Sequence, residues 1–173
     1  MTNTDAPSVR PPPAIARRLA AFLYEGVLLF GVVMIAGYLY SALTQQRHAL
    51  EGRTGQQLFQ FLILGVYFVW FWSHGGQTVA MKTWHLRLQT RDGGPVSQAR
   101  ALARYVLSWI WFAAPLGLIA AHGGQTPPWA LLGWSVVGGI VVYAGFARCL
   151  PGRQFLHDLV CGTRIVDTRP PTA

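Results

Sequence analysis

Four stretches of apolar residues, separated by polar or turn-forming segments, dominate the pattern along the chain. They cover about residues 19–43, 56–73, 105–121 and 129–150. A helix needs roughly 20 apolar residues to cross a hydrocarbon core of about 30 Å, so such stretches predict membrane-spanning helices. Lipid offers the backbone no hydrogen-bond partners, which favours helices within the spans. We therefore expect an all-α membrane protein with four transmembrane helices.

Between the second and third stretches the period of the pattern changes. Trp84, Leu86 and Leu88 alternate with polar residues, which is the period of a half-buried strand. Asp92-Gly93-Gly94-Pro95 then predicts a turn, and a second short strand is expected at residues 163–168. Both segments lie on the same side of the membrane, so we expect them to pair as a two-stranded β ribbon covered by the bilayer surface and helix ends.

A short amphipathic helix is expected between this turn and the third apolar stretch. Ser97 has a side chain that favours the N-cap position. Leu102 and Val106 fall among the apolar positions of this helix, and Arg104 falls on its polar face. Together with the ribbon, the helix forms an interfacial layer made by residues 73–104 and 151–169.

One domain accounts for nearly the whole chain. Residues 1–14 contain three consecutive prolines and predict a disordered or extended arm, residues 15–169 form the transmembrane domain, and residues 170–173 form a tail. The first apolar stretch is too long for a removed signal peptide and lacks the small-residue cleavage pattern, so we expect it to remain as a helix.

The basic residues are distributed unequally between the two sides of the membrane. Twelve of the 14 Lys and Arg residues fall within residues 1–18, 73–104 and 148–169, and only Arg47 and Arg53 fall on the other side. The positive-inside rule places the richer side, and therefore both termini, in the cytoplasm.

The composition excludes several classes of function. The chain is 52% hydrophobic and 12% charged, which is atypical of a soluble domain. Its net charge of +8 lies on the flanks of apolar helices, which favours anionic lipid head groups, and not nucleic acid, as the partner. Cys149 and Cys161 form no metal motif. Phosphate-binding and covalent catalytic motifs are not found, so we expect neither an enzyme nor a cofactor.

Glu25 is the one acid inside the first apolar stretch. An unpaired charge at a helix centre costs about 2.5–3.5 kcal/mol on insertion scales, so this carboxylate needs a partner or a proton. Arg18 lies seven residues earlier on nearly the same helical face, about 10 Å away along the axis, whereas Arg17 lies off that face and is expected to reach the head groups. Two hypotheses stay open: Glu25 and Arg18 form a structural clip, or Glu25 exchanges a proton or cation.

His157 and Asp158 form a second polar pair, near the end of the chain. Neighbouring residues on a helix point about 100° apart, so the two side chains do not suit one metal ion. The favoured interpretation is a hydrogen-bonded anchor in which Asp158 accepts from Arg153, Lys82, Arg100 or a backbone group.

Four separated motifs in this order resemble the RDD family of bacterial membrane proteins, over about residues 15–168. They are Arg18-x-x-Ala21-x-x-x-Glu25, Gly76-Gln77-Thr78-x-x-Met81-Lys82-x-x-x-Leu86-Arg87-Leu88, Asp92-Gly93-x-Pro95 with Arg100-Ala101-Leu102-x-Arg104, and Arg153-Gln154-x-Leu156-His157-Asp158-x-x-x-Gly162-Thr163.

The resemblance implies roles for three charged residues. Arg18 takes the place of the arginine for which the family is named, and Glu25 and Asp158 take the places of its two aspartates. Glu25 departs from the family pattern by one methylene. The resemblance also implies a multi-pass protein of the bacterial inner membrane, in a family of which some members resemble sodium/proton antiporters.

The leading functional expectation is a small transporter or ion/proton-coupled protein that works as a homo-oligomer, because four helices enclose little space. Its substrate would be a cation or a proton. In this reading Glu25 titrates, Arg18 tunes it, and Asp158 with Arg153, His157, Lys82 and Arg100 organises the cytoplasmic mouth. The alternative is a non-transporting accessory or scaffold protein that stabilises or regulates a membrane complex, in which the acids only clip helices together.

Overall fold

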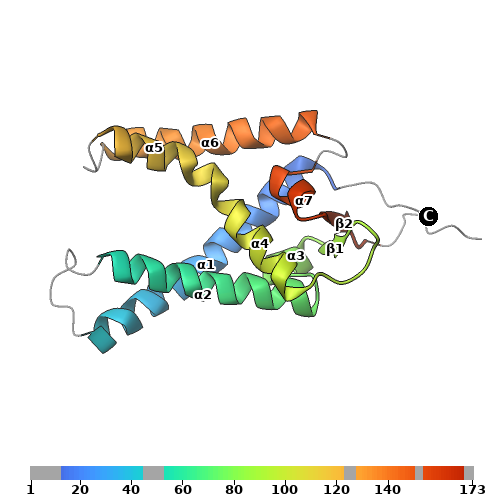
Figure 1. The fold of residues 1–173 in the computed structure, drawn as a ribbon, viewed down its shortest axis with the longest axis horizontal. Coiled ribbons are helices and arrows are strands. Elements are labelled where there is room, and N and C mark those ends of the chain that lie inside the picture. Colours follow the sequence, from blue (N-terminus) through green and yellow to red (C-terminus); the bar gives the residue numbers. More distant parts are fainter. Residues whose placement is uncertain (1–12, 45–52, 123–127, 151–153, 170–173) are drawn as a thin grey trace, which may run out of the picture.

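The computed structural model describes residues 13–44, 53–122, 128–150 and 154–169 of the 173-residue chain. The described part is mostly helical and contains one small sheet (Figure 1). Its elements are α1 (Ile15–Thr44), α2 (Arg53–His74), α3 (Val79–Thr83), β1 (Leu86–Thr90), α4 (Gln98–Ser108), η1 (Trp109–Phe112), α5 (Ala113–Ala121), α6 (Trp129–Cys149), α7 (Leu156–Val160) and β2 (Thr163–Asp167). Residues 1–12 of the predicted arm, the tail at 170–173 and Arg153 lie outside the described residues.

Two of the helices in the described part of the chain are long and apolar enough to cross a membrane. These are α1, with 30 residues, and α6, with 21. Both expose large apolar side chains along their length, among them Val27, Phe30, Trp134 and Val142. Such continuous apolar surface is typical of helices that face lipid.

The third predicted span is not one helix. α4 ends at Ser108, the four residues of η1 form a 3₁₀ turn, and α5 begins at Ala113. Pro115 gives the physical reason. Its ring has no N–H and would clash with the carbonyl four residues earlier in a continuous helix, whereas a proline is tolerated in a first turn. The predicted helix at 105–121 is therefore divided between α4, η1 and α5.

The predicted β ribbon is present. β1 and β2 pair antiparallel, with Leu88 opposite Ile165 and Gln89 opposite Arg164. β1 begins at Leu86, two residues later than the alternation predicts, because Trp84 caps α3 and its N–H donates to Ala80 O.

Arg17 does not extend toward head groups as expected. It donates to Asp167 Oδ2 and to Trp84 O, both at 2.5 Å, and so ties the start of α1 to the ribbon.

Gly76 covers the other edge of β1. Its carbonyl accepts from the backbone N of Leu88 at 2.7 Å, and Gln77 Nε2 donates to Leu86 O at 2.7 Å. Gly76 has φ of +69°, and a Cβ at this position would collide with the carbonyl of Leu88. Glycine is required here because only it combines this backbone conformation with so close an approach.

The buried side chains gather at one end of the molecule. There the start of α1, the end of α2, α3, the ribbon and the start of α4 converge, and α7 lies beside them (Figure 1). Away from this end, the α5–α6 pair diverges from the α1–α2 pair (Figure 1). The interfacial layer expected from the sequence therefore forms the packed end of the molecule, from which the long helices extend.

The register of the ribbon is testable by crosslinking in a chain whose two cysteines are replaced by serine. We expect Gln89→Cys with Arg164→Cys to form a disulfide, because these residues are direct cross-strand partners and their Cβ atoms lie about 5 Å apart. Mobility shifts on non-reducing gels of membranes measure it. Gln89→Cys with Thr168→Cys is the control; equal crosslinking of both pairs would contradict the register.

Candidate functional site

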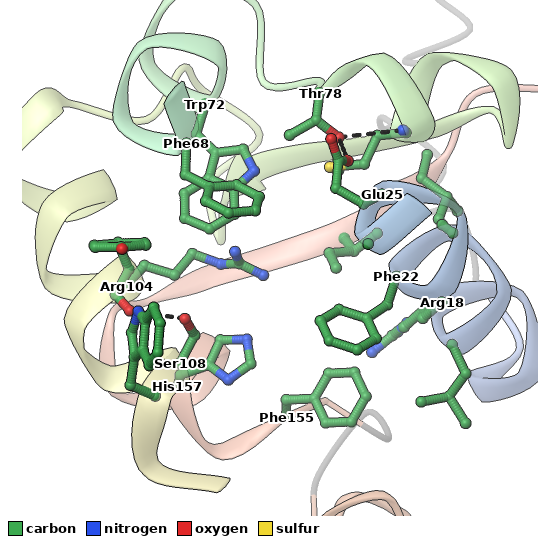
Figure 2. Close-up of a pocket in the computed structure, with 18 of the residues that line it drawn as sticks. Arg18, Phe22, Glu25, Phe68, Trp72, Thr78, Arg104, Ser108, Phe155 and His157 are labelled. Atoms are coloured by element: carbon green, nitrogen blue, oxygen red, sulfur yellow. Dashed lines mark hydrogen bonds between the residues drawn. The ribbon is translucent and has the colours of Figure 1, made fainter. Parts of the chain in front are cut away.

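A cavity of about 330 Å³ lies between the helices at the packed end of the molecule. Its wall is built from α1, α2, α3, α4, η1, α6 and the chain around α7. Its lining includes two arginines, one glutamate and one histidine: Arg18, Arg104, Glu25 and His157. Figure 2 shows Phe22, Phe68, Trp72 and Phe155 around these polar groups. The cavity therefore combines a mainly apolar wall with a few convergent charges, which is typical of ligand sites.

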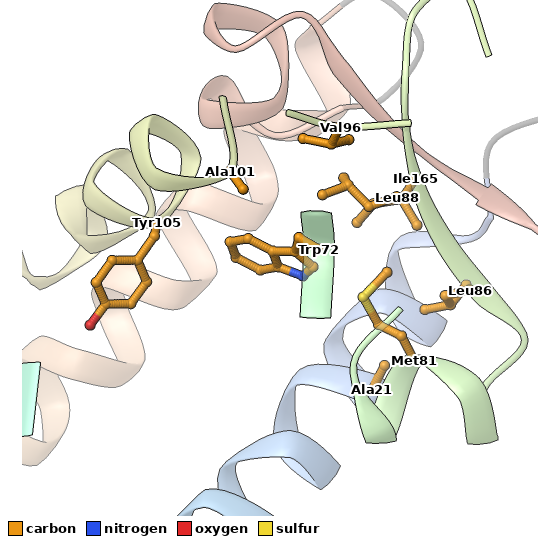
Figure 3. Close-up of a cluster of buried hydrophobic side chains, with 9 residues drawn as sticks. All are labelled: Ala21, Trp72, Met81, Leu86, Leu88, Val96, Ala101, Tyr105 and Ile165. Carbon is orange, nitrogen blue, oxygen red and sulfur yellow. The ribbon is translucent and has the colours of Figure 1, made fainter. Parts of the chain in front are cut away.

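The hydrophobic core holds the α2 and α4 sides of the cavity wall in place. Trp72 from α2 and Tyr105 from α4 belong to both the core and the cavity lining (Figure 3). Tyr105 packs against Phe61 and Phe68, and its hydroxyl donates to Phe61 O at 2.8 Å. Gly65 leaves room for this ring, because a Cβ there would come within 3.1 Å of Tyr105. α2 and α4 are thus held together beside the cavity.

Glu25 is 6% exposed and lies in the cavity wall. Its carboxylate accepts two hydroxyl hydrogen bonds, one from Tyr67 at 2.5 Å and one from Thr78. Within the described part of the chain, no Lys, Arg or His lies close enough to form an ion pair with it. The buried carboxyl group is therefore hydrogen-bonded to neutral donors on α2 and at the N-cap of α3.

Arg18 is 4% exposed and lines the same cavity, as the heptad spacing to Glu25 predicts. Its guanidinium carbon lies 5.9 Å from the centre of the Phe155 ring, a cation–π distance. It also contributes to lowering the pKa of Asp158. Arg18 is therefore oriented toward the C-terminal segment, and within the described residues it forms no ion pair with Glu25.

Asp158 forms the clip instead, with Arg104. The Asp158 side chain is 0% exposed; its Oδ1 accepts from Arg104 Nε at 2.9 Å and forms an ion pair with Arg104 Nη2 at 2.8 Å. The Arg104 guanidinium also stacks 4.3 Å from the Trp72 ring. Burial alone would raise the pKa of Asp158, but Arg104, His157 and Arg18 together hold that pKa below its usual value. Asp158 is thus an ionised anchor between α7 and α4.

Arg104 lies on the opposite face of α4 from the one expected. Ala101, Arg104 and Tyr105 are buried, whereas Leu102 and Val106 are each 52% exposed. The helix therefore turns its arginine into the protein and its aliphatic residues outward, which is reasonable where the outside is lipid and not water. The amphipathic pattern predicted the helix correctly, and the Ser97 cap is confirmed, but the pattern did not indicate that Arg104 is buried.

The other predicted partners of Asp158 lie elsewhere. Lys82 and Arg100 are exposed and neither lines the cavity, and Arg153 is outside the described residues. His157 does lie beside Asp158, with Nε2 at 3.6 Å from Oδ1.

His157 links α7 to α6. Its Nδ1 lies 2.6 Å from the Tyr143 hydroxyl, and that hydroxyl oxygen accepts from the His157 backbone N at 3.4 Å. An imidazole whose Nδ1 accepts from tyrosine keeps its proton on Nε2, facing Asp158. Burial lowers the pKa of His157 to about 4, with Asp158 opposing that effect, so the ring is neutral at pH 7.

Sequence reasoning placed Arg104 within a family motif but did not predict it as the partner of Asp158. It also gave no site role to three hydroxyl residues: Tyr67, Tyr143 and Thr78, the last of which stood only within a family motif. Each supplies a hydroxyl to a buried acid or imidazole. Tyr67 and Tyr143 sit within apolar stretches, where a tyrosine away from the membrane interface is a sequence signal for a buried hydrogen-bond partner. Thr78 precedes α3 and is its N-cap, accepting from Met81 N, which a capping search would have found.

The RDD family's sequence model matches residues 12–162, which is most of the chain. No curated protein and no solved structure matches the chain.

Asp158→Asn is expected to destabilise the protein by roughly 3–5 kcal/mol, because it leaves the Arg104 charge buried without its partner. Asp167→Asn is the matched control. Asp167 is 21% exposed on its side chain and pairs with Arg17 and Arg169 at the surface, so its loss should cost about 1 kcal/mol or less. Thermal unfolding of both purified variants in detergent measures the difference; equal shifts would argue against Asp158 as the anchor.

His157 should make stability fall as the pH falls from 7 to 5. Its folded pKa of about 4 lies below the unfolded value of 6.5, so the unfolded chain binds the extra proton in this window. The loss is on the order of 2 kcal/mol. The lowered pKa of Asp158 keeps that carboxylate charged throughout. Unfolding midpoints at both pH values measure the slope, and His157→Gln should flatten it. An unchanged slope in that variant would refute this assignment.

Proposed function

The chain belongs to the RDD family, and from this premise we propose that it is a small ion- or proton-coupled transporter, similar in action to a sodium/proton antiporter. The observation that carries the proposal is the environment of Glu25. Its carboxylate lines a cavity and is held by two hydroxyls, and it is not paired with an arginine within the described residues. A buried acid that can release or accept a proton without breaking an ion pair is better suited to couple proton movement to transport than to hold helices together.

The two acids of the family motif then have separate roles. Asp158 is fully buried and forms an ion pair with Arg104, so it positions α4 and α7. Glu25 is the group that exchanges a proton or binds a cation such as Na⁺, with oxygen atoms of Tyr67 and Thr78 beside it. Carboxylate and hydroxyl oxygens are hard ligands, which suit a small hard cation.

The proposed topology has four membrane crossings in the bacterial inner membrane. α1 and α6 support it by length and apolarity, and α2, with 22 residues, rises about 33 Å. η1 and α5 would make the remaining crossing. Arg17, Lys82, Arg87 and Arg100 gather at the packed end of the molecule, which favours a cytoplasmic location for that end and for both termini.

A complete transport path needs a second copy in this proposal. One chain surrounds the cavity only at the packed end, and α1 and α6 leave broad apolar faces exposed farther along. A homo-oligomer would supply the missing walls, and anionic head groups would contact the basic end.

The alternative function, an accessory protein of a membrane complex, is favoured by a different observation. Arg87, Arg91 and Arg100 are all exposed around the ribbon and the start of α4, where a partner protein with an acidic surface would bind. Under this alternative Glu25 has no exchange role.

Glu25→Gln is expected to insert and fold but to lose cation-driven proton movement in everted membrane vesicles, because the amide cannot exchange a proton. Glu25→Asp keeps the carboxylate and is the control that should retain part of the activity. Fluorescence quenching of a pH-sensitive dye after addition of Na⁺ or K⁺ measures the movement.

Wild-type vesicles without any Na⁺- or K⁺-driven proton movement would reject the antiport proposal. The same vesicles, solubilised and isolated through an affinity tag on the chain, would then be used to look for a stable partner complex, which is the outcome expected of the accessory protein.

A further inference from the structure

The cavity changes character along its length. At the packed end its wall carries Arg18, Glu25, Thr78 and Arg104. At the other end the wall is apolar and is made by Leu29, Leu64, Phe112, Ile140 and Ala144. From Arg18 to Leu29 is eleven residues along α1, which is about 16 Å. A molecule that fills this space must be polar at one end and apolar over roughly that length.

The formal charges in and behind the wall cancel. Arg18 and Arg104 contribute two guanidinium groups and Glu25 one carboxylate, and the Asp158 carboxylate stands behind the wall against Arg104. His157 also lines the cavity and is neutral. A ligand with a net charge would leave one charge uncompensated where water is scarce, which is costly. A ligand that carries one positive and one negative group, and no net charge, matches the wall.

The charged groups are also arranged for such a ligand. Figure 2 shows the Arg104 guanidinium reaching into the middle of the cavity, Arg18 entering from the opposite wall, and Glu25 lying beside Thr78. Two guanidinium groups suit the oxygens of a phosphate. The Glu25 carboxylate has about four acceptor positions, of which the Tyr67 and Thr78 hydroxyls use two, so it can also accept from an ammonium group.

We propose that the cavity binds one zwitterionic glycerophospholipid with a primary ammonium head group, that is, a phosphatidylethanolamine. Its phosphate lies between Arg18 and Arg104, its ammonium group donates to Glu25, and one acyl chain follows the apolar wall toward Leu29 and Ile140. The polar groups lie at the packed end of the molecule, so the lipid keeps the direction it has in the adjoining leaflet.

The exposed side of α1 gives the lipid a route of entry. Phe22 and Gly26, which line the cavity on α1, are themselves exposed. The cavity therefore reaches the surface at α1, where a membrane lipid would arrive.

This inference goes beyond the proposed function and does not rest on it; a lipid ammonium group and a transported cation would compete for the Glu25 carboxylate. It is tested on the full chain purified in detergent, by native mass spectrometry with phosphatidylethanolamine and phosphatidylglycerol of identical acyl chains. We expect the ethanolamine lipid to bind at least about tenfold more tightly. Equal binding of the two lipids, or tighter binding of phosphatidylglycerol, would overturn the proposal.

Two glycines of α1 provide a matched pair of variants. Gly26 lines the cavity, and Gly31, one and a half turns farther along, does not; a Cβ at either position meets nothing within 4 Å. Gly26→Leu should fill the apolar path and weaken lipid binding at least about tenfold, whereas Gly31→Leu should leave it unchanged. Equal effects of the two variants would reject this cavity as the site.

The head-group contact is tested with Glu25→Gln, which should abolish the preference for phosphatidylethanolamine over phosphatidylglycerol. Free glycerophosphoethanolamine is the arm without acyl chains, and competition at the same concentration as the lipid would rule out a lipid site. Lipid selectivity without proton movement in vesicles rejects the proposed transport alone. Proton movement without lipid selectivity rejects this inference alone.

Discussion

The buried ion pair between Arg104 and Asp158 is the interaction on which the rest of the structure depends. It joins residues 54 positions apart in the chain and lies where α4, α7 and α2 meet. Such a pair tolerates burial only if both partners stay in place. It therefore sets the rotation of α4, places α7 beside the ribbon, and closes the packed end of the cavity. His157 follows from it, since the chain that presents Asp158 also brings the imidazole to Tyr143.

The second acid is buried by different chemistry. Glu25 has hydroxyl donors where Asp158 has a guanidinium, although both lie at the same end of the molecule. A neutral donor leaves its partner free to change protonation state without stranding an opposite charge. In the proposed transporter, the contrast between these two environments, more than the presence of acids within an apolar chain, separates the structural role of Asp158 from the exchange role of Glu25.

Much of this architecture was predictable from local pattern. The long apolar helices, the ribbon with its turn, the Ser97 cap and the burial of Arg18, Glu25 and Asp158 follow from periodicity and residue type. The pairing of the charges was not, because Tyr67 and Thr78 lie 42 and 53 residues from Glu25 and no sequence spacing relates them. The burial of Arg104 on α4 was not predictable from the amphipathic pattern either, because its partner Asp158 lies 54 residues away.

The 3₁₀ turn before α5 has a consequence for the membrane itself. The nine residues of α5 rise about 14 Å and the four of η1 about 8 Å, whereas the 21 residues of α6 rise about 32 Å. Neighbouring segments of such unequal length cannot both match a hydrocarbon layer of about 30 Å. In the proposed four-crossing arrangement the bilayer would be compressed beside α5, and membranes built from shorter acyl chains would accommodate the protein with less distortion.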